Sequence, residues 1–420
     1  MGMHRLGYPL TLALLMVAAG MFVLIVIGIF APSAGLRLAD SDAPPVPDLL
    51  ELAQPIVVST PSIEGAIRAT AAVEGPTPSP TPFPTLTPTL PYTPTTGPIL
   101  AAPAQTAVAL DGIRHVWQTW NNCGPATLTM NLSYFGHPLD QAEVGAALRR
   151  HPDDKNVGPQ ELVAYARSQG FEAQVRVNGS VRLLRRLLSN GIPVLIETWH
   201  EDQGEEGLGH YRLLTGYDDA AGHWIAYDTY DATKLVRPGG PYAGLYVPYG
   251  QLDRLWRFFN RTYLLIYPGE QAGLIAQILA ADSSPDTMWE DALATAAAEI
   301  EADPDDPIAW FNLGAGANAL GETEQAVAAF DRARALGLPW RMFWYQFGAF
   351  EAYASEARYS DLLALVDETL ASVASIEELH YWRGVALSGL GQADAAGAAW
   401  RQSVALNPEF QPALDALAAS

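Results

Sequence analysis

The chain has 420 residues, more than one hydrophobic core usually organises, so two or three domains are expected. Hydrophobic residues make up 49% and charged residues 17%, so most of the chain can form packed domains. The formal net charge of −22 argues against a nucleic-acid partner, because such a partner requires a basic surface.

The first candidate element is an uncharged stretch over residues 8–30. A helix of this length, at about 1.5 Å per residue, spans the hydrocarbon layer of a membrane. His4 and Arg5 precede the stretch and acidic residues follow it, so the N-terminus is expected in the cytoplasm and the rest outside. We predict a single-pass membrane anchor over residues 1–35. A cleaved signal peptide, which would make the protein secreted, is the alternative, but the apolar stretch is longer than such peptides usually have.

A linker is predicted over residues 36–108. Proline and threonine dominate residues 75–98, GPTPSPTPFPTLTPTLPYTPTTGP. Proline fixes φ and threonine adds little to a core, so this stretch favours an extended polyproline-type spacer. It would hold a folded domain away from the membrane.

Residues 109–268 show a mixed pattern of helices and strands. Apolar spacing predicts helices over 160–171 and 181–191, and strands over 192–199, 210–217, 223–230 and 261–268. The turn residues at 218–222 predict that the second and third of these strands form a hairpin. Helices followed by antiparallel strands indicate an α+β domain.

An alanine-rich repeat follows over residues 269–420. Gly314, Gly348 and Gly384 hold the small position of a repeat close to 34 residues long, and each is followed by a second apolar helix pattern. This spacing is typical of tetratricopeptide repeats, and we predict three full repeats and one degenerate repeat in an all-α superhelix. An unrelated helical bundle is the alternative.

Cys123 is the single cysteine, so a disulfide within the chain is excluded. In an oxidising compartment an unpaired thiol is expected to be intermolecular or reactive, with a buried structural thiol as the alternative. A helix N-terminus would lower its pKa, and Gly124-Pro125 suits a first helical turn. Apolar and polar residues alternate over 126–134, which is typical of a strand; a buried helix is nevertheless expected from the resemblance described next.

Two segments carry that resemblance: QTWNNCGPATLTMNLSYFG (118–136) and GLGHYRLLTGYDDAAGHWIAYDTYD (207–231). They resemble the bacteriocin-processing, double-glycine type of cysteine peptidase, which has the papain fold. The resemblance covers roughly residues 110–268 and implies a papain-like domain. It also implies four roles: Cys123 as nucleophile, His210 as general base, Asp228 as the residue that orients the imidazole, and Gln118 as an oxyanion donor.

The hairpin bears on whether His210 and Asp228 meet. With a five-residue loop, Tyr217 faces His223, and Asp228 lies diagonal to His210 on the same face. A four-residue loop would reverse this parity unless a bulge intervened. His200 and His223 are rivals for the base, and Asp219 and Asp231 are rivals for the orienting carboxylate. No metal or other cofactor is expected, because the histidines are scattered and one cysteine gives no ligand spacing.

The sequence as a whole predicts a membrane-anchored, extracytoplasmic cysteine peptidase that acts on a peptide or protein substrate. Its repeats would bind a protein partner or present the substrate. A catalytically degenerate binding module is one alternative, favoured because Gln118 lies one residue closer to the cysteine than the glutamine of the family. A papain-fold acyltransferase or cell-wall amidase is the other.

Overall fold

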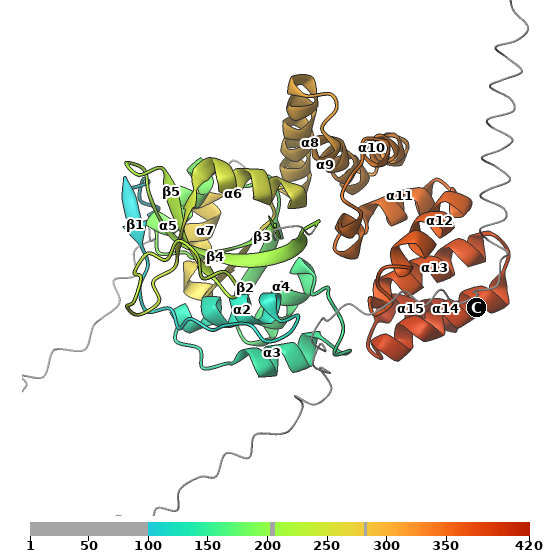
Figure 1. Cartoon of the computed structure of the whole chain (residues 1–420), viewed down its shortest axis with the longest axis horizontal. Coiled ribbons are helices and arrows are strands. Elements are labelled where there is room, and N and C mark those ends of the chain that lie inside the picture. Colours follow the sequence, from blue (N-terminus) through green and yellow to red (C-terminus); the bar gives the residue numbers. More distant parts are fainter. Residues whose placement is uncertain (1–99, 202–205, 281–283) are drawn as a thin grey trace, which may run out of the picture. The chain divides into compact units, whose positions relative to one another are not determined.

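The computed structural model describes residues 100–201, 206–280 and 284–420 (Figure 1). All of them belong to one compact unit, Tyr92–Ser420. The predicted anchor over residues 1–35 and most of the predicted linker over 36–108 lie outside the described residues. Within the described ranges, no helix is both long enough and apolar enough to cross a membrane.

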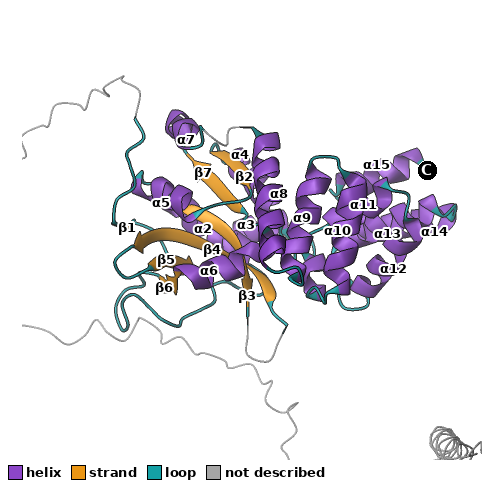
Figure 2. Ribbon diagram, turned by 90° about the horizontal axis from the view of Figure 1, so that it is seen from above, coloured by secondary structure: helices purple, strands orange, loops and turns teal. Residues whose placement is uncertain are grey.

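An antiparallel sheet organises the first part of the unit (Figure 2). Its strands lie in the order β2, β7, β3, β4, β5, β6, and β1 pairs with the far end of β4. Their bounds are β1 Ala107–Ala109, β2 Glu172–Arg176, β3 Val194–His200, β4 Leu208–Asp218, β5 His223–Asp228, β6 Leu245–Pro248 and β7 Tyr263–Tyr267.

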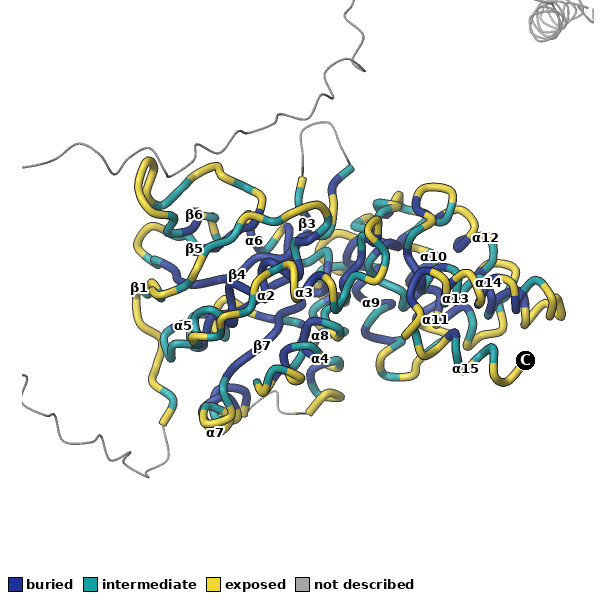
Figure 3. Tube along the Cα trace, turned by 90° about the horizontal axis from the view of Figure 1, so that it is seen from below, coloured by how far each residue is buried: buried dark blue, intermediate teal, exposed yellow. Residues whose placement is uncertain are grey.

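Helices cover both faces of this sheet because its central strands carry apolar side chains on both sides. In β4, Leu213 packs with one helical layer and the adjacent Leu214 with the other. The first layer contains α2 Cys123–Tyr134, α3 Gln141–Leu148 and α4 Pro159–Ser168. The second contains α5 Val181–Ser189, α6 Tyr249–Trp256 and α7 Ala272–Ile278. Figure 3 shows the buried strands between them. The predicted α+β architecture is confirmed.

The strand-like alternation over residues 126–134 belongs to α2, as the resemblance implied. Every residue from Gly124 to Leu132 is buried, so the helix has no polar face and no helical periodicity. Its buried threonines find partners nearby: the Thr127 hydroxyl donates to the Tyr211 carbonyl at 3.3 Å, and that of Thr129 to the Pro125 carbonyl at 2.9 Å. A helix buried all round therefore carries the residue predicted as the nucleophile at its first position.

The second part of the unit is all helical. Its helices are α8 Pro285–Ala302, α9 Pro307–Ala319, α10 Thr323–Ala335, α11 Gly348–Ser355, α12 Tyr359–Leu370, α13 Glu377–Gly389, α14 Ala393–Leu406 and α15 Gln411–Ala419. The glycines at the small position allow close helix packing. A Cβ on Gly314 would lie 2.8 Å from the Phe330 ring, and one on Gly384 would lie 2.2 Å from Trp400 Nε1.

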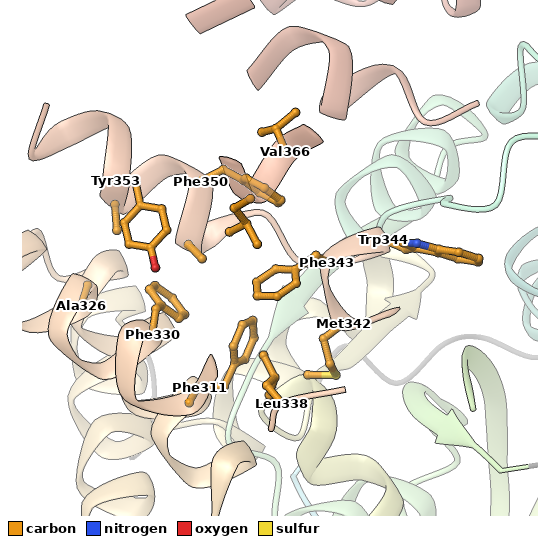
Figure 4. Close-up of a cluster of buried hydrophobic side chains, with 14 of the residues drawn as sticks. Phe311, Ala326, Phe330, Leu338, Met342, Phe343, Trp344, Phe350, Tyr353 and Val366 are labelled. Atoms are coloured by element: carbon orange, nitrogen blue, oxygen red, sulfur yellow. The ribbon is translucent and has the colours of Figure 1, made fainter. Parts of the chain in front are cut away.

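The middle repeat departs from the prediction. Gly314 and Gly384 are each the eighth residue of their helix, whereas Gly348 is the first residue of α11. A short 3₁₀ helix, η4 Trp340–Trp344, stands where the first turns of a repeat helix were expected. Its Met342 and Phe343 enter the aromatic core of the helical part, beside Phe311 and Phe350 (Figure 4).

Candidate active site

The loop before Cys123 is held by a side chain of α3, Gln141, and by that of Arg149, the residue after α3. Gln141 accepts from the backbone N–H of Thr119 at 2.9 Å and donates to the Trp117 carbonyl at 2.6 Å. Arg149 donates to the Trp120 carbonyl at 2.9 Å and to Asn122 Oδ1 at 3.1 Å. These bonds fix the backbone of a loop that has no regular secondary structure of its own.

Asn122 seats the same loop against α3. Its side-chain amide donates to the Gln141 carbonyl at 3.1 Å, and a Cβ on Gly145 would lie only 2.7 Å from its Oδ1. The residue before it, Asn121, adopts a left-handed conformation with φ of 54°. This turn reverses the chain into the helix and presents Cys123 at its first position.

Cys123 occupies the N-terminus of a helix, where backbone N–H groups lack intrahelical partners. Pro125 costs nothing there, because the missing N–H belongs to the first turn. The thiol is partly exposed and hydrogen-bonds to the imidazole of His210. Burial opposes ionisation, but this bond, the nearby imidazolium and the N–H groups of Tyr211 and Gly124 outweigh it. The pKa of Cys123 is therefore lowered.

The β4–β5 hairpin brings His210 and Asp228 together by a route that the sequence left open. Its loop has four residues, because Asp218 rather than Tyr217 pairs with His223. Taken alone, the four-residue loop would place Asp228 on the opposite face of the sheet from His210. A register shift at Thr215, between Leu214 and Gly216, compensates for this. The structure therefore has the second of the two arrangements, a four-residue loop with a bulge, and Asp228 lies diagonal to His210 on the same face.

The imidazole of His210 lies between the carboxylate and the thiol. Its Nε2 is 3.0 Å from Asp228 Oδ1, which leaves Nδ1 as the nitrogen for Cys123. Burial alone would lower the pKa of His210. The charge and hydrogen bond of Asp228 and the hydrogen bond to Cys123 outweigh burial and raise this pKa to about 9. The imidazolium form is thus favoured near neutral pH.

Arg212 is a member of this cluster that the sequence analysis did not identify. Its Nε donates to Asp228 Oδ2 at 2.8 Å, and its guanidinium also hydrogen-bonds to Thr198 and His200. Burial favours the protonated carboxyl, yet the charges of His210 and Arg212 hold the pKa of Asp228 far below its usual range. The sequence signal that could have identified Arg212 was its spacing from His210, since residues two apart in a strand share a face.

The backbone of Asp228 is held from the opposite side. The Tyr242 hydroxyl accepts from its N–H at 3.1 Å, and His115 Nε2 lies 2.8 Å from its carbonyl oxygen. The two rings stack with centroids 3.5 Å apart. The N–H groups of Tyr230 and Asp231 donate to Asp228 Oδ1, each at 2.8 Å. The carboxylate therefore has a single position.

Gln118 lies in the same pocket as Cys123. Its backbone N–H donates to the Thr229 carbonyl at 2.9 Å, and the Thr229 hydroxyl donates to its Oε1 at 2.7 Å. The accepting end of the amide is thereby occupied. Its Nε2 is the end of the amide that can donate a hydrogen bond.

These groups line a pocket of about 340 Å³. Its lining residues are Gln118, Thr119, Trp120, Asn121, Cys123, Lys155, His200, Leu208, Gly209, His210, Tyr230 and Tyr345. Trp120 is 71% exposed and Tyr230 is 56% exposed, so aromatic surface is available beside the thiol.

The rival residues have other surroundings. His200 lies in the pocket but bonds to Arg212 through Nδ1, with its ring 5.4 Å from that of His210. His223 lies at the far end of β5 against Tyr246. Asp219 pairs with Arg185, and Asp231 accepts from the N–H of Thr233. Among the residues described, no group of three or more His, Cys, Asp or Glu side chains is arranged to hold a metal ion.

Residues 110–238 match the model of the Peptidase_C39-like family. This confirms, for that part of the chain, the resemblance on which the site residues were chosen. No curated protein matches the chain.

Three solved structures illustrate the likeness, and each covers less than half of this chain. A double-glycine-motif protease from an AMS/PCAT transporter, solved with its leader peptide, is 19% identical over 39% of this chain and 99% of its own, with a TM-score of 0.27. Xylellain, a cysteine protease from Xylella fastidiosa, is 11% identical over 39% and 87%, with a TM-score of 0.26. MamA from Desulfovibrio magneticus RS-1 is 20% identical over 34% and 78%, with a TM-score of 0.29.

The chain thus combines a segment that matches the C39-like family with a helical region that has the glycine spacing of tetratricopeptide repeats. The boundaries at residues 108/109 and 268/269 stay predictions. Trp199 and Phe259 of the first part share a buried cluster with Phe311 and Met342 of the second, so the two parts pack through a common core.

Proposed function

We propose that the protein is a cysteine peptidase that hydrolyses peptide bonds through an acyl-enzyme. The observation that carries the proposal is the chain of contacts from the Cys123 thiol to the His210 imidazole and on to the Asp228 carboxylate, at 3.0 Å for the second contact. A thiol with a lowered pKa beside an imidazole with a raised pKa favours the thiolate–imidazolium pair. That pair is the reactive form of a thiol nucleophile.

In the proposed reaction the Cys123 thiolate attacks the scissile carbonyl, and a C–S bond forms as the carbonyl π electrons move to oxygen. The backbone N–H of Cys123 and Nε2 of Gln118 stabilise this oxyanion. The C–N bond then breaks, and His210 gives its proton to the leaving amine. Water, deprotonated by His210, then attacks the thioester. The C–S bond breaks, the carboxylic acid product leaves, and the Cys123 thiolate and the His210 imidazolium are restored.

Asp228 would keep the imidazole in one orientation and stabilise its cationic form, without itself taking the proton. Arg212 keeps this carboxylate ionised, so Asp228 does not take the proton that His210 has received. The proton stays on the imidazole until His210 donates it to the leaving amine.

Labelling with a thiol-reactive peptidyl probe tests the proposal. A peptidyl acyloxymethyl ketone should modify Cys123 rapidly in the native protein. His210→Ala should reduce the labelling rate about 10²- to 10⁴-fold, the usual contribution of a general base. His223→Ala is the matched control, because this histidine lies on the same hairpin at the far end of β5, and it should label like the native protein.

Equal labelling of the native protein and both variants would overturn the proposal and leave a catalytically inactive binding module. An acyltransferase or amidase would label as a peptidase does. Incubation with peptide and with peptidoglycan, and mass analysis of the products, separates these reactions.

We also propose that residues 8–30 anchor the protein in a membrane with its folded part outside the cytoplasm. The uncharged length of that stretch and the charges that flank it support this topology. Carbonate extraction and external protease treatment of cells that express the full chain provide the test. A folded part that resists external protease in intact cells but not in lysed cells would contradict it.

A further inference from the structure

The helical region contributes directly to the candidate active site through the distorted middle repeat. The segment from Trp340 to Phe347, called here the repeat insert, replaces the first turns of the expected helix. Three of its side chains hydrogen-bond to the part of the chain that contains the sheet, called here the peptidase part. Arg341 donates to the Gly207 carbonyl at 3.1 Å, and Gln346 donates to the Phe258 carbonyl at 2.9 Å.

Tyr345 makes the third contact, at the residue before His210. Its hydroxyl hydrogen-bonds to the backbone of Gly209, and a Cβ on Gly209 would lie 3.1 Å from its ring. The ring also meets Phe259 edge to face, with centroids 6.0 Å apart. Any larger residue at position 209 would therefore push against the rings of Tyr345 and Phe259.

Tyr345 also lines the pocket that contains Cys123 and His210. A second link crosses the same pocket: the Lys155 ammonium lies 5.4 Å from the Trp120 ring and 5.7 Å from the Trp344 ring. Trp120 precedes the cysteine, and Trp344 belongs to the repeat insert. The wall of the pocket is thus built from both parts of the chain.

We propose that Tyr345 determines specificity, by limiting the size of the substrate side chain accepted next to the scissile bond. This rests on the proposed peptidase function. The ring is held on one edge by the Gly209 backbone and on its sides by Trp199 and Phe259, so it cannot swing away without breaking these contacts. A rigid aromatic wall one residue from the base leaves less room than the peptidase part alone would.

The test compares peptidyl acyloxymethyl ketones that differ only in the residue beside the reactive group, glycine or leucine. The rate constant for labelling Cys123 is measured with each. Tyr345→Ala should raise the leucine-to-glycine rate ratio about ten-fold or more, because the vacated space admits the larger side chain. Tyr345→Trp enlarges the ring and should lower the ratio. Tyr345→Phe keeps the ring and should leave it within about two-fold.

Trp340→Ala is the matched control, since Trp340 belongs to the same segment but is 43% exposed and lines a separate pocket. It should leave the ratio unchanged. Labelling by iodoacetamide, which needs no substrate pocket, reports the state of the thiol in each variant.

A ratio that is unchanged in Tyr345→Ala and Tyr345→Trp, with normal iodoacetamide labelling, would overturn this inference while the peptidase proposal stands. Failure of the native protein to react with any peptidyl probe would instead overturn the proposed function itself. If Tyr345→Ala unfolds, the Trp and Phe variants still decide, because both preserve an aromatic ring at the contact.

Discussion

Arg212 lies directly opposite Asp228 across the β4–β5 ladder, and its Nε donates to Asp228 Oδ2 at 2.8 Å. The side chain of Arg212 is 6% exposed and that of Asp228 is fully buried. Removal of one partner of a buried ion pair leaves an uncompensated charge. We therefore expect Arg212→Ala to lower the free energy of unfolding by about 3–5 kcal/mol, measured by urea denaturation.

Arg254→Ala is the comparison for this effect. Arg254 pairs with Glu201 through two hydrogen bonds, but both side chains are about half exposed. An exposed pair contributes about 0–1 kcal/mol, so this variant should unfold close to the native protein. Losses of similar size in the two variants would show that Arg212 is not holding a buried charge.

The reactivity of Cys123 should depend on pH in a way that identifies its partner. His210 lowers the pKa of the thiol, while burial raises it. In the native protein the rate of iodoacetamide labelling should therefore rise below the ordinary thiol pKa of about 8.5. In His210→Ala only burial and the backbone N–H groups remain, so the midpoint should move to higher pH.

The same pair should set an upper pH limit for the proposed peptide cleavage. In that reaction the imidazolium donates its proton to the leaving amine, and the pKa of His210 is about 9. Cleavage of a peptide substrate should therefore decline above this pH, while iodoacetamide labelling continues to a plateau. A parallel rise of both rates above pH 9 would argue against His210 as the proton donor.

The sequence predicted four strands of the sheet and three groups that contact one another in the site, Cys123, His210 and Asp228. Apolar alternation and turn residues predicted β3, β4, β5 and β7. The pleat then forces His210 and Asp228 onto one face once the register is known. The register itself was not predictable, because Asp218 extends β4 by one residue and the bulge at Thr215 compensates for it.

Arg212 and Tyr345 were missed for different physical reasons. Arg212 shares a face with His210, but a basic residue in a strand is usually solvent-exposed, and its burial became evident only with Asp228 opposite. Tyr345 was assigned to a repeat helix. The run WRMFWYQF at 340–347 departs from alanine-rich repeats, but nothing local in it specifies a contact with Gly209 far away in the sequence.

Gln118 can be tested separately from the thiol. A ketone probe passes through an oxyanion, whereas iodoacetamide does not. If Gln118 donates to that oxyanion, Gln118→Ala should slow labelling by the ketone about 10²-fold and leave iodoacetamide labelling unchanged. The tether from Thr229 supplies a control: Thr229→Val removes the bond to Oε1 and should cause a smaller loss. If Gln118→Ala slowed labelling by both reagents equally, the role of Gln118 would be to hold the conformation of the loop before Cys123.

The repeat region depends on close approach at its glycines. A Cβ on Gly384 would lie 2.2 Å from Trp400 Nε1, and that indole also bonds to the Tyr381 carbonyl. Gly384→Ala should lower the free energy of unfolding by about 1–3 kcal/mol, the usual cost of overpacking. Gly273→Ala in α7 meets nothing within 4 Å and should be neutral or stabilising by up to about 1 kcal/mol. Thermal denaturation of both variants checks the difference.

Carboxyl groups of the loop before α4, of α4 and of α13 should make stability fall as pH rises. Burial, with the nearby charge of Glu377, raises the pKa of Asp154 to about 8, and burial raises that of Glu161 to about 7. Glu378 is half-buried and accepts from Asn156 at 3.3 Å. This contact joins the part of the chain that contains the sheet to the repeats.

The direction of this pH dependence follows from the number of protons bound in the folded and unfolded states. The folded state keeps a proton on Asp154 up to about pH 8, whereas the unfolded chain releases it near 3.8. The stabilisation is therefore complete below about pH 4 and is lost between pH 4 and 8, by at most about 1.4 kcal/mol per pH unit for each proton. Asp154→Asn cannot ionise, so its free energy of unfolding should vary less with pH than that of the native protein. Chemical denaturation at pH 5, 6.5 and 8 measures both slopes, and equal slopes would show that Asp154 is ionised in the folded chain.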